Sequence, residues 1–224
     1  MIKIENIETY GWEAAIRGMR NPMNSWDKSD TAWVNDPDAQ QKAVAYNSEG
    51  SALLIGDNDR NLMKRLAKAG NDHGKFLRFI CVTLDINAPL YWWKEFDTYK
   101  VGTVANSCST MHKIHATTFT LDDFSHEHLT SESLGVLENL ISILNGVREK
   151  YLETKDKQDW WQMIQLLPSS YNQRRTVHLN YAVLKNMYHA RKNHKLDEWL
   201  DFCKWVRELP YAKEWIVGDS DSNN

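Results

Sequence analysis

The clearest pattern in the chain is a helical one that runs from Ser131 to Thr154. Apolar residues recur there at every third or fourth position, the spacing that places side chains on one face of an α-helix: Leu134, Leu137, Leu140, Ile141, Leu144, Val147 and Tyr151. Shorter patterns of the same kind predict helices at Trp12–Met19, Asp57–Gly70, Pro89–Phe96, Asp156–Leu167, Asn172–Arg191 and Leu196–Leu209. Asp57 suits an N-cap position, where a short polar side chain accepts backbone N–H groups.

Alternating apolar and polar positions predict a β-strand at Phe76–Ile86, because successive side chains of a strand point to opposite faces. A short strand is expected before Trp12, and loop with extended chain is expected within 98–120. Residues 21–51 are rich in Asn, Asp, Ser, Gly and Pro, which predicts a long loop with one helical segment near 40–45. Together these elements indicate an α+β fold, a small antiparallel sheet with surrounding helices.

Length and composition fit one domain of this kind at 1–218, followed by a disordered tail at 219–224. With 224 residues, of which 42 % are hydrophobic, the chain is long enough to build a core. The net charge of −3 gives no general attraction to nucleic acid. No stretch approaches the ~20 apolar residues of a membrane span, and the first residues do not resemble a signal peptide. We therefore expect a cytoplasmic protein without a membrane partner.

The cysteines and histidines provide only weak candidate sites. Three cysteines are too few and too far apart for a disulfide framework, so reduced thiols are expected: Cys81, Cys108 and Cys203. Cys108 is a candidate nucleophile because a nearby cation such as Lys100 can activate a thiol, although a buried or merely tolerated cysteine is the favoured interpretation. The pairs His112/His115 and His126/His128 lack the further convergent ligands that zinc requires, so no metal is expected.

Tryptophan is frequent in this chain, with ten residues. Two adjacent pairs stand out, Trp92–Trp93 and Trp160–Trp161. Tryptophan rings are large and mostly apolar, so packing in the core and between subunits is the favoured interpretation. Stacking of a ligand on these rings is the alternative. This abundance favours an oligomer.

The most informative spacing lies in the last third of the chain: Leu167-Pro168, then Asn180, Leu184, Asn186 and Arg191. It resembles the L-P…N-x-x-x-L-x-N-x-x-x-x-R segment of the flavin-dependent thymidylate synthases (ThyX), and weaker matches extend the resemblance over residues 57–216. The resemblance implies the ThyX fold and a homotetramer that holds FAD between subunits. It also implies one-carbon transfer to a pyrimidine nucleotide, dUMP or a related one, with a reduced folate as donor and NADPH.

The same resemblance assigns the site residues. Arg191 is the catalytic candidate, because in the family this arginine polarises the pyrimidine base, and an arginine stays protonated and stabilises negative charge. Four residues are assigned to the cofactor: Asn180, Asn186, Lys100 and Tyr99. Four more are assigned to the substrate: Glu95, Asn106, Cys108 and Arg174.

A second family signature, R-H-R-x-x-S-x-N-E-x-S-x-R, falls on Thr98–Thr110, where the chain departs from it. Thr98 and Thr110 replace arginines, and Asn106 replaces the glutamate. Ile164 stands where the family has another arginine that contacts the nucleotide. Threonine cannot grip a phosphate with two parallel hydrogen bonds as arginine does, so a changed nucleotide substrate becomes an alternative.

Two other classes of function remain open. A catalytically inactive relative could keep the fold to bind a nucleotide or a partner protein. A binder of single-stranded nucleic acid could use aromatic rings beside a basic stripe on the C-terminal helices, although nucleic acid is not the expected partner. The stripe comprises Arg174, Arg175, Lys185, Arg191, Lys192 and Lys195.

Overall fold

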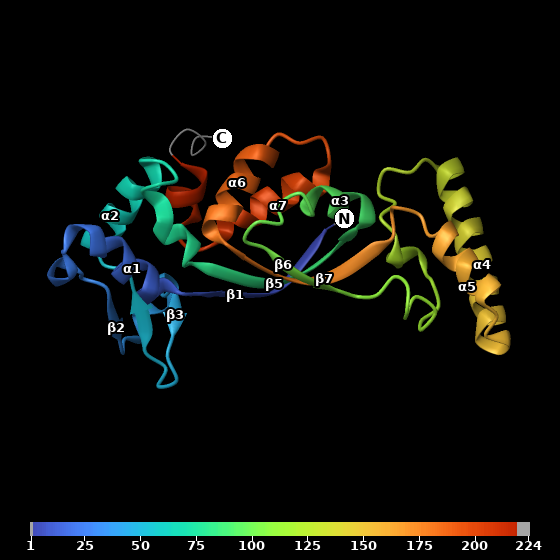
Figure 1. Ribbon diagram of the computed structural model, residues 1–224, viewed down its shortest axis with the longest axis horizontal. Helices are drawn as coiled ribbons and strands as arrows, with labels where there is room; N and C mark the ends of the chain where they lie inside the picture. The colour runs from blue at the N-terminus through green and yellow to red at the C-terminus, as the bar shows by residue number, and fades with distance from the viewer. Residues whose placement is uncertain (1, 219–224) are drawn as a thin grey trace. The chain divides into compact units, whose positions relative to one another are not determined.

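Strands of residues 2–218, the part of the chain that the computed structural model describes, form two sheets (Figure 1). The larger sheet has the strand order β1-β5-β7-β6, and the smaller has the order β2-β4-β3. The strands are β1 (Lys3–Tyr10), β2 (Ala32–Val34), β3 (Ala45–Tyr46), β4 (Ala52–Leu54), β5 (Cys81–Pro89), β6 (Val104–Ser107) and β7 (Asn172–Asn180).

Helices account for most of the remaining structure. The α-helices are α1 (Trp12–Arg20), α2 (Asp57–Lys68), α3 (Leu90–Phe96), α4 (Ser131–Thr154), α5 (Lys157–Leu166), α6 (Tyr181–Arg191) and α7 (Asp197–Glu208). Short 3₁₀ turns are η1 (Asn21–Met23), η2 (Trp26–Lys28), η3 (Pro37–Lys42), η4 (Gly74–Arg78) and η5 (Leu121–Asp123), and η6 (Lys213–Val217) is a π-helical turn. The predicted α+β class is confirmed.

The chain divides into two compact units. The first, which we name the α4–α5 unit, comprises residues 2–5, 85–98 and 105–176. The second, the α6–α7 unit, comprises residues 6–84, 99–104 and 177–218. Each unit has a core of its own. The core of the α4–α5 unit is formed by Ile114, Phe119, Phe124, Leu137, Ile141 and Leu144.

In the α6–α7 unit the core joins residues that are far apart in the sequence. The ring centroid of Trp12 lies 5.5 Å from that of Tyr181 and 6.2 Å from that of Trp215. Phe76 meets Trp215 edge to face at 5.9 Å. Such contacts between rings contribute beyond the apolar area that they bury. They connect α1, η4, α6 and η6 within this unit.

Several predicted helices are confirmed. The bounds of α4 match those predicted, and its apolar stripe is the side that packs into the core. Helix α5 follows where it was expected, since Asp156 caps it by accepting the Gln158 N–H at 2.9 Å. The strand before Trp12 and the helix that begins there are confirmed as β1 and α1.

The prediction of one long helix at Asn172–Arg191 is wrong, because residues 172–180 form strand β7. Burial alternates along it as in a strand covered on one face: Gln173, Val177 and Leu179 are buried, whereas Arg174 and Thr176 are exposed. Asn180 then starts α6, since its Oδ1 accepts the Val183 N–H at 3.1 Å. Helical spacing in α6 itself is what extended the prediction too far upstream.

The strand predicted at Phe76–Ile86 begins later, at Cys81. Phe76 is buried, but it belongs to η4, so its place in the alternating series is a coincidence of spacing. From Cys81 onward the series holds, because Val82, Leu84 and Ile86 are all buried. The predicted strand is therefore right in type and wrong at its start.

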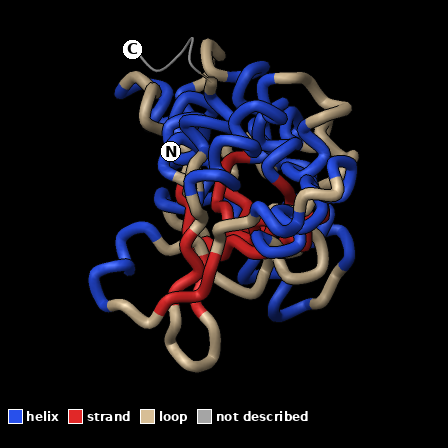
Figure 2. Tube along the Cα trace, turned by 90° about the vertical axis from the view of Figure 1, so that its left-hand side faces the viewer, coloured by secondary structure: helices blue, strands red, loops and turns tan. Residues whose placement is uncertain are grey.

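Residues 21–51 are more ordered than the predicted loop, since they contain two strands of the small sheet together with the turns η1, η2 and η3. Ala32–Val34 and Ala45–Tyr46 both pair with Ala52–Leu54, antiparallel. This small sheet lies below α1 and α2 in the view of Figure 1, and the turn between β3 and β4 is also the lowest part of Figure 2. These strands have only two or three residues each, too few to show an alternation, so the sequence does not predict them.

Asp57 is not the N-cap of α2. Gly56 occupies that position, and the capping carboxylate comes from Asp30, which accepts the N–H groups of Asn58 and Asp59 at 2.9 and 3.0 Å. A cap supplied by a residue so distant in the sequence leaves no local signal. Asp57 lies in the first helical turn, where a negative charge still favours the helix.

The tryptophans divide into a buried and an exposed group. Trp12, Trp92, Trp93, Trp199 and Trp215 are each no more than 1 % exposed, so the core interpretation is confirmed for them. The pair Trp92–Trp93 is therefore covered within the chain and offers almost no ring area to another subunit. Trp26, Trp33 and Trp161 are the largely exposed members, at 52, 37 and 39 %.

No helix among residues 2–218 is long and apolar enough to cross a membrane. The predicted tail at 219–224 lies outside the described residues.

Candidate functional site

Arg191 ends helix α6 and lies against two aromatic rings of the α6–α7 unit. Its Nε donates to Tyr99 Oη at 2.9 Å. The guanidinium carbon lies 4.9 Å from the ring centroid of Trp199 and 5.6 Å from that of Tyr99. The two rings meet edge to face with centroids 6.1 Å apart. A cation within about 6 Å of a ring face is attracted to it, so the hydrogen bond to Tyr99 and the two rings help to hold Arg191 in a fixed position.

The segment 99–104 brings Tyr99 to this arginine by packing on the first turn of α6. Gly102 has a φ of +82°, and a Cβ there would lie 3.0 Å from Val183 Cγ2 and 3.4 Å from Asn180 Nδ2. Only glycine combines this backbone conformation with so close an approach. Thr103 Oγ1 closes the segment by donating to the Tyr99 carbonyl at 2.7 Å.

Burial sets the protonation of two groups near α6. It lowers the pKa of Lys185, whose Nζ donates to the Ala67 carbonyl at 2.7 Å. It raises the pKa of Cys203 to about 12, against the opposing effect of the Arg191 charge. Cys203 therefore remains a thiol at neutral pH, and its Sγ lies 3.9 Å from the Tyr188 carbonyl oxygen. Arg191, which lies near Cys203, contributes a positive charge to this region.

A second cluster lies in the α4–α5 unit around Arg174. Arg174 Nη2 donates to Asp85 Oδ2 at 2.7 Å, and Thr176 Oγ1 donates to Asp85 Oδ1 at 2.5 Å. The hydrogen bond and charge of Asp85 raise the pKa of Arg174. Cys108 is joined to the cluster through its backbone, because its N–H donates to the Arg174 carbonyl at 2.9 Å. A ligand at Arg174 would have to share the guanidinium with Asp85.

The other predicted site residues divide between the units. Glu95 is half-buried on α3 and Asn106 is exposed in β6, both in the α4–α5 unit. Lys100 and Asn186 are exposed in the α6–α7 unit, and no described residue bonds to either side chain. Within one unit the structure thus brings Arg191 together with Tyr99, and within the other it brings Arg174 together with Cys108.

The predicted basic stripe is not a feature of the C-terminal helices alone. Arg174 and Arg175 belong to strand β7, and each is engaged. Arg175 Nη1 donates to Asp97 Oδ1 at 2.8 Å, and its guanidinium carbon lies 4.2 Å from the Trp93 ring centroid. Since the arginines of β7 neutralise aspartates, they add little positive potential for a nucleic acid.

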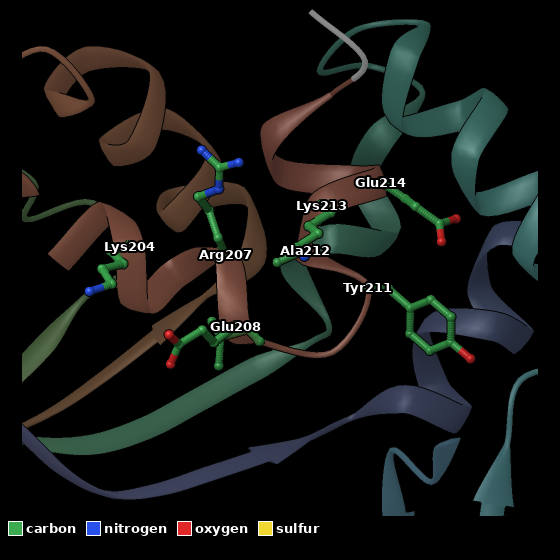
Figure 3. Close-up of a pocket in the computed structure, with 8 residues that line it drawn as sticks. Lys204, Arg207, Glu208, Tyr211, Ala212, Lys213 and Glu214 are labelled. Carbon is green, nitrogen blue, oxygen red and sulfur yellow. The ribbon is translucent and has the colours of Figure 1, made fainter. Parts of the chain in front are cut away.

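A hollow of about 650 Å³ lies at the C-terminal end of α7, and none of the predicted site residues lines it. Figure 3 shows Lys204, Arg207 and Glu208 extending from α7, with Tyr211 and Glu214 extending to the other side. Glu214 is engaged in an ion pair with Arg60. Charges of both signs point away from one another around this open hollow, so it lacks the convergent polar groups of a ligand site.

The histidine pairs do not gather with further ligands. Among the described residues no group of three or more His, Cys, Asp or Glu side chains could hold a metal ion. The His115 ring lies edge to face against Tyr151, with centroids 4.9 Å apart. His126 Nδ1 lies 2.8 Å from the Phe124 carbonyl oxygen. These two histidines take part in local contacts of the α4–α5 unit.

The architecture defines the class: the chain has the α+β fold of the flavin-dependent thymidylate synthases. One solved structure with this fold is ThyX from Helicobacter pylori with FAD and dUMP, which matches over 100 % of both chains with a TM-score of 0.66 and 14 % sequence identity. A second structure of the H. pylori enzyme, complexed with FAD and dUMP, matches over 97 % of this chain and 98 % of that one, with a TM-score of 0.64 and 14 % identity. No protein-family model and no curated protein matches the sequence.

Trp199 is a member of the Arg191 cluster that the sequence did not reveal. It comes shortly after Arg191 in the sequence but lies on the next helix, α7, and no motif marks it. Asp85 was missed around Arg174 for a similar reason, since it faces β7 from the neighbouring strand β5. In both cases the partner is identified by strand or helix pairing and not by spacing along the chain.

Proposed function

We propose that the chain is a divergent relative of ThyX that binds FAD and transfers a one-carbon group to a pyrimidine nucleotide. The observation that carries the proposal is the position of Arg191, at the end of α6 and fixed against Tyr99 and Trp199. The resemblance assigns this arginine to the pyrimidine base. The solved structures that share the fold over the full chain are described as containing FAD and dUMP.

Arg191 is suited to polarise a bound base. Its guanidinium keeps its proton at any physiological pH and can donate in-plane hydrogen bonds to a carbonyl or to a deprotonated ring nitrogen. The hydrogen bond from its Nε to Tyr99 Oη, at 2.9 Å, helps to fix the orientation of the guanidinium plane. Fixed donors aimed at developing negative charge lower a barrier because they need no reorganisation during the reaction.

The described residues fit FAD in part. Lys100 and Asn186, which the resemblance assigns to the cofactor, have exposed side chains without a described partner, so both can bind a ligand. Asn180 keeps only its amide N–H groups for a ligand, because its Oδ1 caps α6. When bound, FAD would supply the carrier of hydride or methylene, with a reduced folate as donor and NADPH as reductant, in a homotetramer.

A catalytically inactive relative that binds a nucleotide or a partner protein is the second candidate. It is supported by the polar groups that the chain already uses internally: Asn180 caps a helix, and Arg174 pairs with Asp85. It is also supported by the threonines at Thr98 and Thr110, where the resemblance places arginines. Such a protein would bind a nucleotide without turning it over.

The two candidates are separated by an assay of the purified chain with FAD, dUMP, methylenetetrahydrofolate and NADPH, together with a binding titration. The proposal predicts formation of a methylated nucleotide and its loss in Arg191→Ala. Removing one such donor costs about 2.7–4 kcal/mol of transition-state stabilisation, or roughly a hundred- to thousandfold in rate. Nucleotide binding without turnover under these conditions would instead establish the second candidate.

Two further variants make this result specific. Arg191→Lys keeps the charge but loses the planar group that meets Tyr99 and Trp199, so we expect it to restore little activity. Arg207→Ala on α7 is the matched control, a loss of arginine outside the site, and should leave turnover unchanged. Full turnover in Arg191→Ala would contradict the role given to this residue.

A further inference from the structure

A hollow of about 260 Å³ in the α6–α7 unit is lined in part by two exposed tryptophans, Trp26 and Trp33. Ile16 of α1 and Leu53 of β4 contribute apolar side chains to its lining. A second hollow of about 370 Å³ shares Trp33, Leu53 and Arg17, so Trp33 borders both. None of the residues assigned to the flavin or nucleotide lines either hollow. Apolar walls with a few polar groups at the edge are typical of small-molecule sites.

Both tryptophan rings are held by hydrogen bonds at their edges. Trp26 Nε1 donates to Asn21 Oδ1 at 2.8 Å, and Trp33 Nε1 donates to Glu13 Oε1 at 3.0 Å. The single polar atom of each ring is therefore satisfied within the chain, and the ring faces remain for contact. Trp33 is also fixed by its backbone, which pairs with Leu53 in the small sheet.

A buried ion pair holds the segment that carries these rings. Arg20 Nε donates to Asp59 Oδ1 at 2.6 Å, with the two side chains 4 % and 0 % exposed. The remaining guanidinium nitrogens bond to the carbonyls of Ser25 and Lys28, on either side of Trp26. An aromatic site whose walls are already ordered loses less entropy on binding.

Charged groups at the hollow indicate what kind of ring it would take. Arg17 is exposed beside both hollows, and no described residue forms an ion pair or hydrogen bond with its side chain. The Glu13 carboxylate has one oxygen engaged by Trp33, and no described residue bonds to the other. Arg17 can therefore receive an anion, while Glu13 can accept an N–H from a ring.

We propose that this hollow binds a planar nitrogen heterocycle that carries an anionic group, with the ring against Trp26 and Trp33 and the anion at Arg17. Stacking of a flat heterocycle on tryptophan is favourable for many ring types, so the charge supplies the selectivity. A nucleotide phosphate and a pterin carboxylate both satisfy this chemistry. The site is separate from the function proposed above and does not depend on Arg191.

Calorimetric titration with two pairs of probes tests the proposal: dGMP against deoxyguanosine, and pterin-6-carboxylate against pterin. We expect at least one anionic probe to bind tenfold or more tightly than its uncharged partner. Arg17→Ala should abolish that difference, and Trp26→Ala should weaken binding at least tenfold. The anionic probe that binds more tightly identifies whether phosphate or carboxylate is the preferred group.

Matched variants keep the test specific. Trp161→Ala removes another exposed tryptophan, from α5 in the other unit, and should leave binding unchanged. Arg17 is exposed on α1, so its replacement by alanine should leave the fold intact even if Trp26→Ala does not fold. The proposal is overturned if no probe binds at millimolar concentration, or if binding persists unchanged in Arg17→Ala and Trp26→Ala. It is also overturned if Trp26→Ala lowers the mass measured by light scattering, since the hollow would then be a subunit contact.

Discussion

Replacing Asp59 by asparagine removes the negative charge from a carboxylate that is fully buried in the α6–α7 unit. Its Oδ1 accepts from Arg20 Nε at 2.6 Å, and its Oδ2 accepts from Ser29 Oγ and Thr31 Oγ1, both at 2.7 Å. The backbone N–H groups of Asp30 and Thr31 also reach Oδ2, at 3.2 and 3.1 Å. The asparagine side chain has the same shape but cannot neutralise the arginine.

The magnitude follows from leaving Arg20 buried without its counter-ion. Removing one partner of a buried ion pair costs about 3–5 kcal/mol, a large part of the roughly 5–15 kcal/mol by which most domains are stable. In a chain of this size each 1 kcal/mol lowers the unfolding midpoint by about 2–4 °C. We therefore expect Asp59→Asn to unfold about 6–20 °C below the unsubstituted chain at pH 7.

The effect should depend on pH in a definite direction. Burial opposes the charge on Asp59, but the hydrogen bonds from Thr31, Ser29 and Arg20 outweigh it and hold the pKa below its ordinary value of 3.8. A carboxylate with a lowered pKa in the folded state stabilises the fold above its unfolded pKa and loses that contribution as the pH falls through the folded value. The difference between Asp59→Asn and the unsubstituted chain should therefore shrink below about pH 4.

Thermal unfolding followed by circular dichroism from pH 7 to pH 3 measures both quantities. Glu5→Gln is the matched control, because it makes the same chemical change in the exposed pair Lys3–Glu5, whose contact distance is 2.7 Å. An exposed ion pair contributes only about 0–1 kcal/mol. Midpoints of Asp59→Asn and Glu5→Gln that agree within error at pH 7 would refute the reasoning, as would a difference that does not change down to pH 3.

Three further predictions concern other parts of the chain. Gly102→Ala forces a left-handed conformation on alanine and should cost about 1–2 kcal/mol, seen as a midpoint lower by about 2–8 °C; an unchanged midpoint would contradict the packing of 99–104 on α6. Iodoacetamide at pH 8 should label the exposed Cys108 long before the buried Cys203, because the raised pKa of Cys203 disfavours its thiolate. Equal labelling of the two cysteines in mass spectrometry would contradict the exposure of Cys108 and the burial of Cys203. Calorimetry should show that dUMP binds this chain at least about a hundredfold more weakly than it binds H. pylori ThyX, because each lost charge-assisted contact is worth about 1.5–3 kcal/mol. A low-micromolar affinity for dUMP would show instead that other residues bind its phosphate. The positions that lack the expected arginines are Thr98, Thr110 and Ile164.

Helices with a long apolar stripe could be predicted from the sequence, whereas elements that depend on tertiary pairing could not. Helix α4 has enough turns for its period to be unambiguous, so its bounds agree with the structure. Strand β7 has only two apolar residues, Val177 and Leu179, and it runs directly into α6. The helical spacing of α6 therefore extends the prediction upstream until Asn180 is known to be a cap. The small sheet has strands of two or three residues, too short for any period.

The candidate site could be predicted only where a family motif marks it. Arg191 and Tyr99 were both named from the resemblance, and the structure brings them within hydrogen-bond distance. Trp199 and Asp85 carry no motif, since their positions are set by packing between helices and between strands. The roles assigned to the nine site residues, the homotetramer and a single domain at 1–218 stay predictions.

The most direct test of the central claim is the flavin content of the purified chain. Spectroscopy after saturation with FAD and gel filtration should show a band at about 450 nm, as expected of an oxidised flavoprotein. We predict close to one FAD per chain, together with a change in that band when dUMP or another pyrimidine nucleotide is added, and no such change in Arg191→Ala. A colourless protein that retains no FAD after this treatment would contradict the proposed flavin chemistry and leave only the fold in common with ThyX.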